Sequence, residues 1–158
     1  MSYITAEPAV VDLMGMLAYA ELLAFDQMAT DAKLAPDLTR RAILSEMAGS
    51  EIVNHRRIAA RLGELDVDPE AAMGPFRAAL DDYHDQTGPN DWLEALTKAY
   101  VGDSIADDFV REVAQGLGGA DRDLVLDVLH DTRYVDYAAG EIRAALGSAD
   151  TALATELS

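Results

Sequence analysis

Apolar residues along the chain recur every three or four positions, the spacing that gathers them on one face of an α-helix. Four long segments share this pattern, at residues 9–32, 37–65, 91–117 and 122–146. Asp37 is the expected N-cap of the second segment, and Asn90 or Asp91 that of the third. Gly118 and Gly119 separate the last two segments. We therefore predict an all-α fold built on four long helices.

The connections between these segments differ in length. Residues 66–89 form a long crossover that contains three prolines, with room for a short helix at 76–84, whereas the other two connections span only a few residues. One long connection between the second and third helices is the connectivity of ferritin-like four-helix bundles. We predict that residues 1–158 form one such domain, with a frayed tail after Gly147.

Charge and composition limit the functions open to this fold. The chain has 12 basic and 29 acidic residues, so its net charge is 12 − 29 = −17. This charge disfavours direct binding of nucleic acid. The absence of cysteine excludes disulfides and thiolate metal sites. The beginning of the chain lacks a signal-peptide pattern, and the apolar run at residues 14–25 is short and interrupted by Glu21, so we expect a cytoplasmic protein that spans no membrane.

Each of the four helices is predicted to carry acidic side chains on its apolar face. In the first, Glu21 is surrounded at helical spacing by apolar residues such as Leu17, Ala24 and Met28. The same test directs further acids inward, namely Glu51, Asp103, Asp107 and Asp131. Buried carboxylates that converge need cations or protons to compensate their charge, and a pair of divalent metal ions provides such compensation.

Three segments carry a resemblance to a known family: Leu17-Ala18-Tyr19-Ala20-Glu21-Leu22, Asp91-Trp92-Leu93-Glu94 and Lys98-Ala99-Tyr100-Val101-Gly102-Asp103. With them the chain resembles, from about residue 16 to 146, the actinobacterial ferritin-like family related to tRNA 2-methylthio-isopentenyladenosine hydroxylase. The resemblance implies a non-haem di-iron centre, with two iron or manganese ions, that uses O2 to hydroxylate a C–H bond. By position, it implies four metal ligands: Glu21, Glu51, Asp103 and Asp131.

The resemblance also shows where this sequence departs from the family. The Glu-x-x-His pairs of di-iron bundles are replaced here, because Asn54 and Tyr134 stand where the histidines belong. An amide oxygen is a weaker donor to iron than imidazole, and a phenol must lose a proton to bind well. His55, four residues after Glu51, is either an extra ligand or a residue packed at the edge of the core.

Two functions therefore remain open from the sequence. The first is an O2-dependent di-metal hydroxylase, and the second is a metal-free, non-catalytic helical scaffold that acts through its surface. In the second case the core acids would hold protons and form hydrogen bonds with Asn54 and Tyr134, and Tyr100 would join this network or simply pack. His84 and His130 are predicted at the surface. Dimerisation through an exposed helix face is compatible with the pattern.

Overall fold

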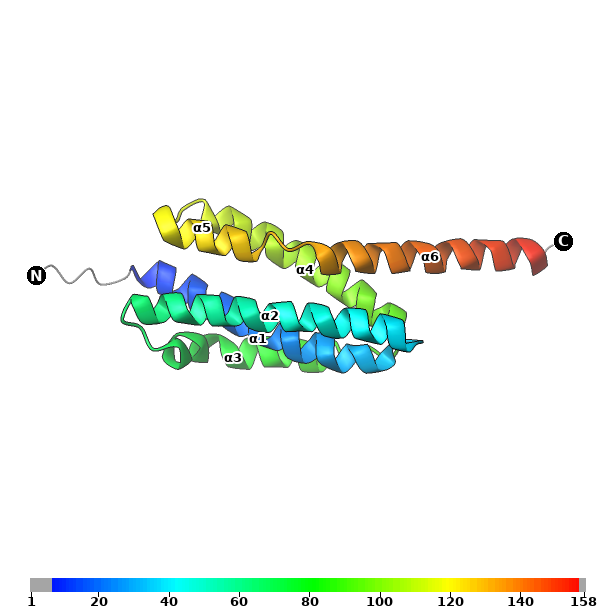
Figure 1. Ribbon diagram of the computed structural model, residues 1–158, viewed down its shortest axis with the longest axis horizontal. Helices are drawn as coiled ribbons and strands as arrows, with labels where there is room; N and C mark the ends of the chain where they lie inside the picture. Colours follow the sequence, from blue (N-terminus) through cyan, green and yellow to red (C-terminus); the bar gives the residue numbers. More distant parts are fainter. Residues whose placement is uncertain (1–6, 157–158) are drawn as a thin grey trace, which may run out of the picture.

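The computed structural model describes residues 7–156, and this part of the chain consists of helices and contains no strand (Figure 1). The elements, in chain order, are α1 (Pro8–Asp31), the 3-10 turn η1 (Ala32–Leu34), α2 (Leu38–Glu64), α3 (Pro69–Gln86), α4 (Trp92–Ala114), α5 (Gly119–Val128) and α6 (Arg133–Glu156). The predicted all-α class is confirmed.

The predicted helix starts are confirmed by their capping bonds. The Asp37 carboxylate accepts a hydrogen bond from the backbone N–H of Arg40 at 2.8 Å, and Asp91 accepts one from Glu94 at 2.8 Å. Such bonds satisfy backbone N–H groups that have no partner within the first turn of a helix. Asp91, and not Asn90, is therefore the cap of α4.

The crossover is more ordered than the sequence indicated. Where we expected a short helix at 76–84, α3 runs over 18 residues from Pro69 to Gln86 and includes Pro75. Its start has a clear cause, because Asp68 caps it and proline is tolerated at the first helical position. The helix packs along α1, where Gly15 makes room for it: a Cβ on Gly15 would lie 2.2 Å from the carbonyl oxygen of Ala72.

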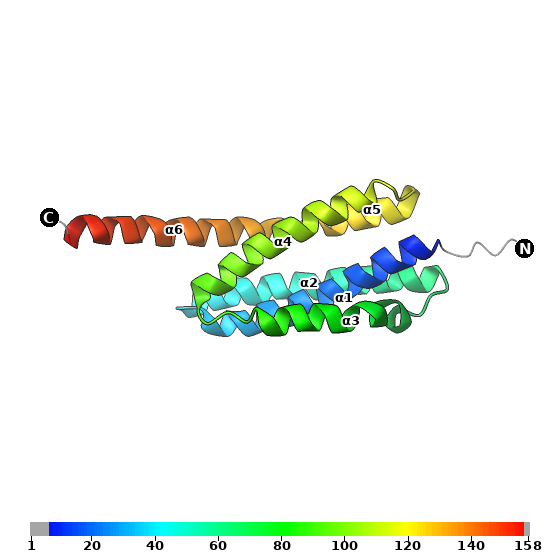
Figure 2. The same ribbon diagram turned by 180° about the vertical axis from the view of Figure 1, so that it is seen from behind.

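The predicted fourth helix, 122–146, is two helices in the structure. The chain leaves the helical path after Val128 and begins α6 at Arg133, which then continues to Glu156 instead of fraying after Gly147. Thr132 favours the new start, because its carbonyl oxygen accepts from the Asp136 N–H at 2.9 Å and its hydroxyl group bonds the Asp136 carboxylate. The last turns of α6 extend beyond the other helices (Figures 1 and 2).

The helices form two groups. In the first, α1 contacts both α2 and α3 closely; in the second, α4 contacts α5 and α6. Figure 2 shows α4 crossing obliquely over the first group. Helix α2 also contacts α5 and α6, and its arginines form ion pairs there, from Arg57 to Asp127 at 2.5 Å and from Arg61 to Asp121 at 2.7 Å. Charged side chains on α2 therefore help to hold the two groups together.

Apolar packing is divided into two clusters along the bundle. One joins residues such as Met14, Ile58 and Val110, and the other joins residues such as Leu44 and Leu96. Helices α1, α2 and α4 each contribute residues to both clusters. On each of these helices the inward acids lie between the residues of one cluster and those of the other. The fold therefore contains a polar layer between two apolar layers.

Helix α1 and the turn after it, Pro8–Leu34, are long and apolar enough to cross a membrane, with a mean hydropathy of 1.5 in the most apolar window. In the structure this segment has helices packed along it, and its residues Met14 and Ala18 are fully buried against them. An apolar helix in the core of a bundle meets the same criterion, so this finding is weak evidence for a membrane span. Our expectation that the protein spans no membrane stays a prediction.

Candidate carboxylate site

The acids that the sequence placed inside the bundle surround one cavity of about 260 Å³. The cavity lies between the two helix groups. Its polar lining consists of Glu21, Glu51, Asn54, Asp103, Asp107, Asp131 and Tyr134. The structure therefore brings together all five predicted acids, and also Asn54 and Tyr134.

Glu21 and Glu51 form the centre of this site. Glu21 on α1 is only 8% exposed, and its carboxyl group lies beside that of Glu51 on α2. Burial and then the neighbouring Glu51 raise the pKa of Glu21 far above its ordinary value, and burial also raises the pKa of Glu51, so this pair retains a proton near neutral pH. The amide of Asn54 donates to the other side of Glu21 at 3.5 Å.

Asp103 and Asp107 enter the cavity from α4. Burial, and then the negative charges of Glu51 and Asp107, raise the pKa of Asp103 to about 7. The pKa of Asp107 is also raised, mainly by burial, although Arg111 at 4.0 Å opposes this shift. Near neutral pH, part of this cluster is therefore protonated, which relieves the repulsion between neighbouring acids.

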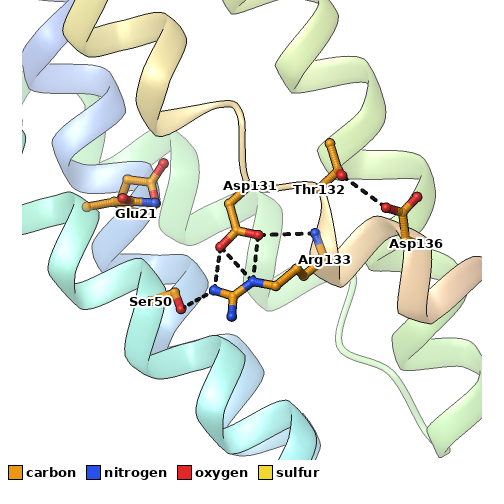
Figure 3. A network of polar contacts seen from close by, with 7 residues as sticks. Glu21, Ser50, Asp131, Thr132, Arg133 and Asp136 are labelled. Carbon is orange, nitrogen blue, oxygen red and sulfur yellow. Dashed lines mark hydrogen bonds and ion pairs between the residues drawn. The ribbon is translucent and has the colours of Figure 1, made fainter.

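Asp131 differs from the prediction. It lies in the loop between α5 and α6, not within a helix, and its side chain is 31% exposed. Its carboxylate binds the guanidinium group of Arg133 at 2.6 Å, which lowers the pKa of Asp131. Arg133 in turn donates to Ser50 on α2 at 2.7 Å, so that this pair bridges α2 and the loop (Figure 3). Asp131 borders the cavity but already has a cation as its partner.

Of the remaining candidates, one lines the cavity and two lie outside its lining. Tyr134 is buried, and burial followed by the charge of Asp103 raises its pKa, so its phenol stays protonated. His55 donates from Nδ1 to the carbonyl oxygen of Ala18 at 2.7 Å and does not line the cavity, which agrees with packing at the edge of the core. Tyr100 is 39% exposed and also lies outside the cavity lining.

These residues fit a two-metal centre poorly. Among residues 7–156, no three histidine, aspartate or glutamate side chains are grouped closely enough to hold an ion. Asp131 is paired with Arg133, and Tyr134 offers a neutral phenol. The site has the acids of a di-iron bundle but lacks its nitrogen ligands.

The fold and this arrangement can now be compared with known proteins. A family model described as "Ferritin-like domain, actinomycetes" matches residues 5–158, nearly the whole chain. The chain belongs to this ferritin-like family. No curated protein is significantly similar to it in sequence. The family assignment confirms the ferritin-like fold that we predicted. The description of the family names no activity.

The structure of this ferritin-like domain also reveals polar residues that our sequence reasoning missed. Asp31 near the end of α1 is only 3% exposed, and Lys98 on α4 has a buried amino group. His84, which we expected at the surface, has a buried Nδ1 atom. Together with Asp31 and Lys98 it lines a second cavity. Helical spacing could have found Asp31, because it follows Ala24 and Met28 on the inward stripe of α1.

Proposed function

We propose that this ferritin-like domain is a metal-free, non-catalytic helical protein whose core acids share protons where its relatives hold two metal ions. The observation that carries this proposal is the pairing within the carboxylate site. The pKa values of the neighbouring Glu21 and Glu51 are raised and Asp131 is paired with Arg133, while Asn54 and Tyr134 stand where we expect the histidines of di-iron bundles. A site whose acids already have partners gains less from binding a cation.

The second candidate is an O2-dependent di-iron hydroxylase, as the resemblance to tRNA hydroxylase relatives implies. It is favoured by the convergence of acids from α1, α2, α4 and the loop after α5 on one cavity. A tRNA substrate is harder to accommodate, because a protein with a net charge of −17 repels a large polyanion. This candidate therefore has support for its site but not for its substrate.

Metal loading distinguishes the two functions. The protein is incubated anaerobically with Fe(II), desalted, analysed for iron and manganese, and then exposed to O2 while the optical spectrum is recorded. We expect no retained metal in the natural protein. Retention of roughly two irons per chain, with an oxo-bridge absorption, would refute our proposal and support the hydroxylase.

A restored variant makes this comparison sharper. The double substitution Asn54→His and Tyr134→His returns both histidines to the positions that di-iron bundles use. If the missing nitrogen ligands are the reason for weak metal binding, this variant retains more iron than the natural protein. Equal and high retention in both proteins would show that the replaced histidines are not decisive.

Two further expectations accompany the proposal. A cytoplasmic location and a homodimer both stay predictions from the sequence. Sedimentation analysis of the purified protein at several concentrations measures the oligomeric state directly, and fractionation of cells measures the location.

A further inference from the structure

A second and larger cavity, of about 560 Å³, lies beside the carboxylate site between α1, α3 and α4. Its size falls within the range of small-molecule pockets, roughly 300–1,000 Å³. Most of its wall is apolar and includes Leu23, Ala24, Leu80, Ile105 and Phe109. The two cavities share Asp103 and Tyr134 as part of their walls.

One region of this wall is polar and lacks bonding partners. Lys98 Nζ and His84 Nδ1 are both buried, and neither has a hydrogen-bond partner among the described residues. The ring of Tyr83 lies 5.8 Å from Lys98 Nζ and packs edge-on against the His84 ring. A buried polar group without a partner is destabilising, so two together call for an explanation.

The neighbouring acid does not provide that partner. Asp31 is buried and accepts a hydrogen bond from Gln27 at 2.9 Å, and no ion pair joins it to Lys98 within 4.0 Å in the described chain. Burial raises the pKa of Asp31 and lowers that of Lys98, while the charges of Asp31 and Asp103 oppose the change at Lys98. Burial also lowers the pKa of His84, which favours a neutral ring with one N–H to donate.

We propose that this cavity binds a small monocarboxylate with an aliphatic tail, whose carboxylate accepts hydrogen bonds from Lys98 and His84 while the tail lies against α1 and α4. A carboxylate offers two acceptor oxygens, which suits two donors in the wall of one cavity. The aliphatic tail suits a wall of leucine, alanine, isoleucine and phenylalanine. Ligand binding here is measured without any metal, so either proposal can fail without the other.

Calorimetric titration of the full chain with octanoate tests the proposal, with octanol and octylamine as probes of the same length. We expect octanoate to bind the natural protein roughly tenfold to hundredfold more tightly than either probe, because a hydrogen bond to a charged group contributes about 1.5–3 kcal/mol. The substitution Lys98→Met should remove this preference. Octanol binding as tightly as octanoate, or no octanoate binding, overturns the proposal.

The chain provides a matched control, because it contains only one other lysine, Lys33, which is exposed. Lys33→Met should leave octanoate binding unchanged. A second measurement needs no substitution: reductive methylation followed by mass spectrometry reports the reactivity of each lysine. Octanoate should slow the labelling of Lys98 and not that of Lys33. Equal labelling of Lys98 with and without octanoate contradicts the proposed site.

Discussion

The two helix groups of this domain are packed to different degrees. In the group of α1, α2 and α3, residues such as Met14, Ile58 and Leu62 are fully buried. In the group of α4, α5 and α6, helix α4 exposes Ile105 by 67% and Phe109 by 58%. Both helix groups have apolar residues in their sequences, so the difference in their exposure depends on which helices cover those residues. Exposed apolar patches of this kind are typical of interaction surfaces.

The cavities lie where these groups meet. Helices α1 and α4 both line each cavity, although they are not among the closely contacting helix pairs of the bundle. A tightly interlocked core leaves few voids larger than a water molecule. The looser contact between the groups therefore provides the space for both the carboxylate site and the proposed ligand site.

The largest difference should appear between two isoleucines. Ile58 is fully buried in the first group, so Ile58→Ala should lower the free energy of unfolding by roughly 2–5 kcal/mol. Ile105→Ala removes the same atoms from an exposed position and should change stability by no more than about 0.5 kcal/mol. Urea denaturation followed by circular dichroism measures both. Similar losses in the two variants would show that Ile105 is covered in solution.

A glycine pair tests the contact between α1 and α3. Gly15→Ala places a Cβ against the Ala72 backbone, which cannot move as a flexible side chain can, so we expect a loss of about 1–3 kcal/mol or more. Gly49→Ala, on α2, meets open space and should be neutral or stabilising by up to about 1 kcal/mol, because alanine favours helix. Thermal denaturation of the two variants gives the comparison. A neutral Gly15→Ala would mean that α3 does not pack as described.

The acids between the groups should make stability depend on pH. The pKa of Glu21 is raised in the folded state, so the folded chain binds a proton that the unfolded chain has lost, and stability falls as pH rises above the ordinary value. Glu21→Gln keeps a hydrogen-bond donor beside Glu51 but has no carboxyl group to ionise, so it removes this loss of stability at high pH. In chelator-treated protein, it should be roughly 1–2 kcal/mol more stable than the natural protein at pH 8, with little difference at pH 4.

Asp131 provides a control of opposite sign. Its pKa is lowered by Arg133, so its contribution to stability is present above its ordinary pKa and is lost as pH falls through the folded value. Asp131→Asn should therefore weaken the protein at pH 8, in contrast to Glu21→Gln. Parallel denaturation series from about pH 2 to pH 8 compare both. The same pH dependence in both variants would contradict the proton sharing that we infer for Glu21.

The smallest effect is expected at the ion pairs that join the groups. Arg57 and Asp127 are both largely exposed, and exposed pairs contribute about 0.2–1 kcal/mol. A double-mutant cycle with Arg57→Ala and Asp127→Ala should give a coupling energy in this range that decreases with added salt. A larger coupling that resists salt would show a tighter contact between the groups than the exposed side chains indicate.

The pattern of the sequence determined much of the fold and the membership of the site. It predicted helices at 9–32 and 37–65, and the structure places them within one residue of those ends, because apolar periodicity and caps act within a few residues of one another. It also identified Glu21, Glu51 and Asp103 as inward acids, since a buried helix face can be recognised from its neighbours along the chain.

Only the tertiary structure decided what those acids do. The apolar periodicity of the sequence continues from Val128 to Val135, so it does not reveal the break between α5 and α6. This break places Asp131 in a loop and in contact with Arg133. Likewise, Lys98 and His84 lie on different helices, and only the tertiary structure places them in the wall of one cavity. Periodicity reports which face of a helix is buried, whereas the partner of a charged side chain depends on which helix lies opposite.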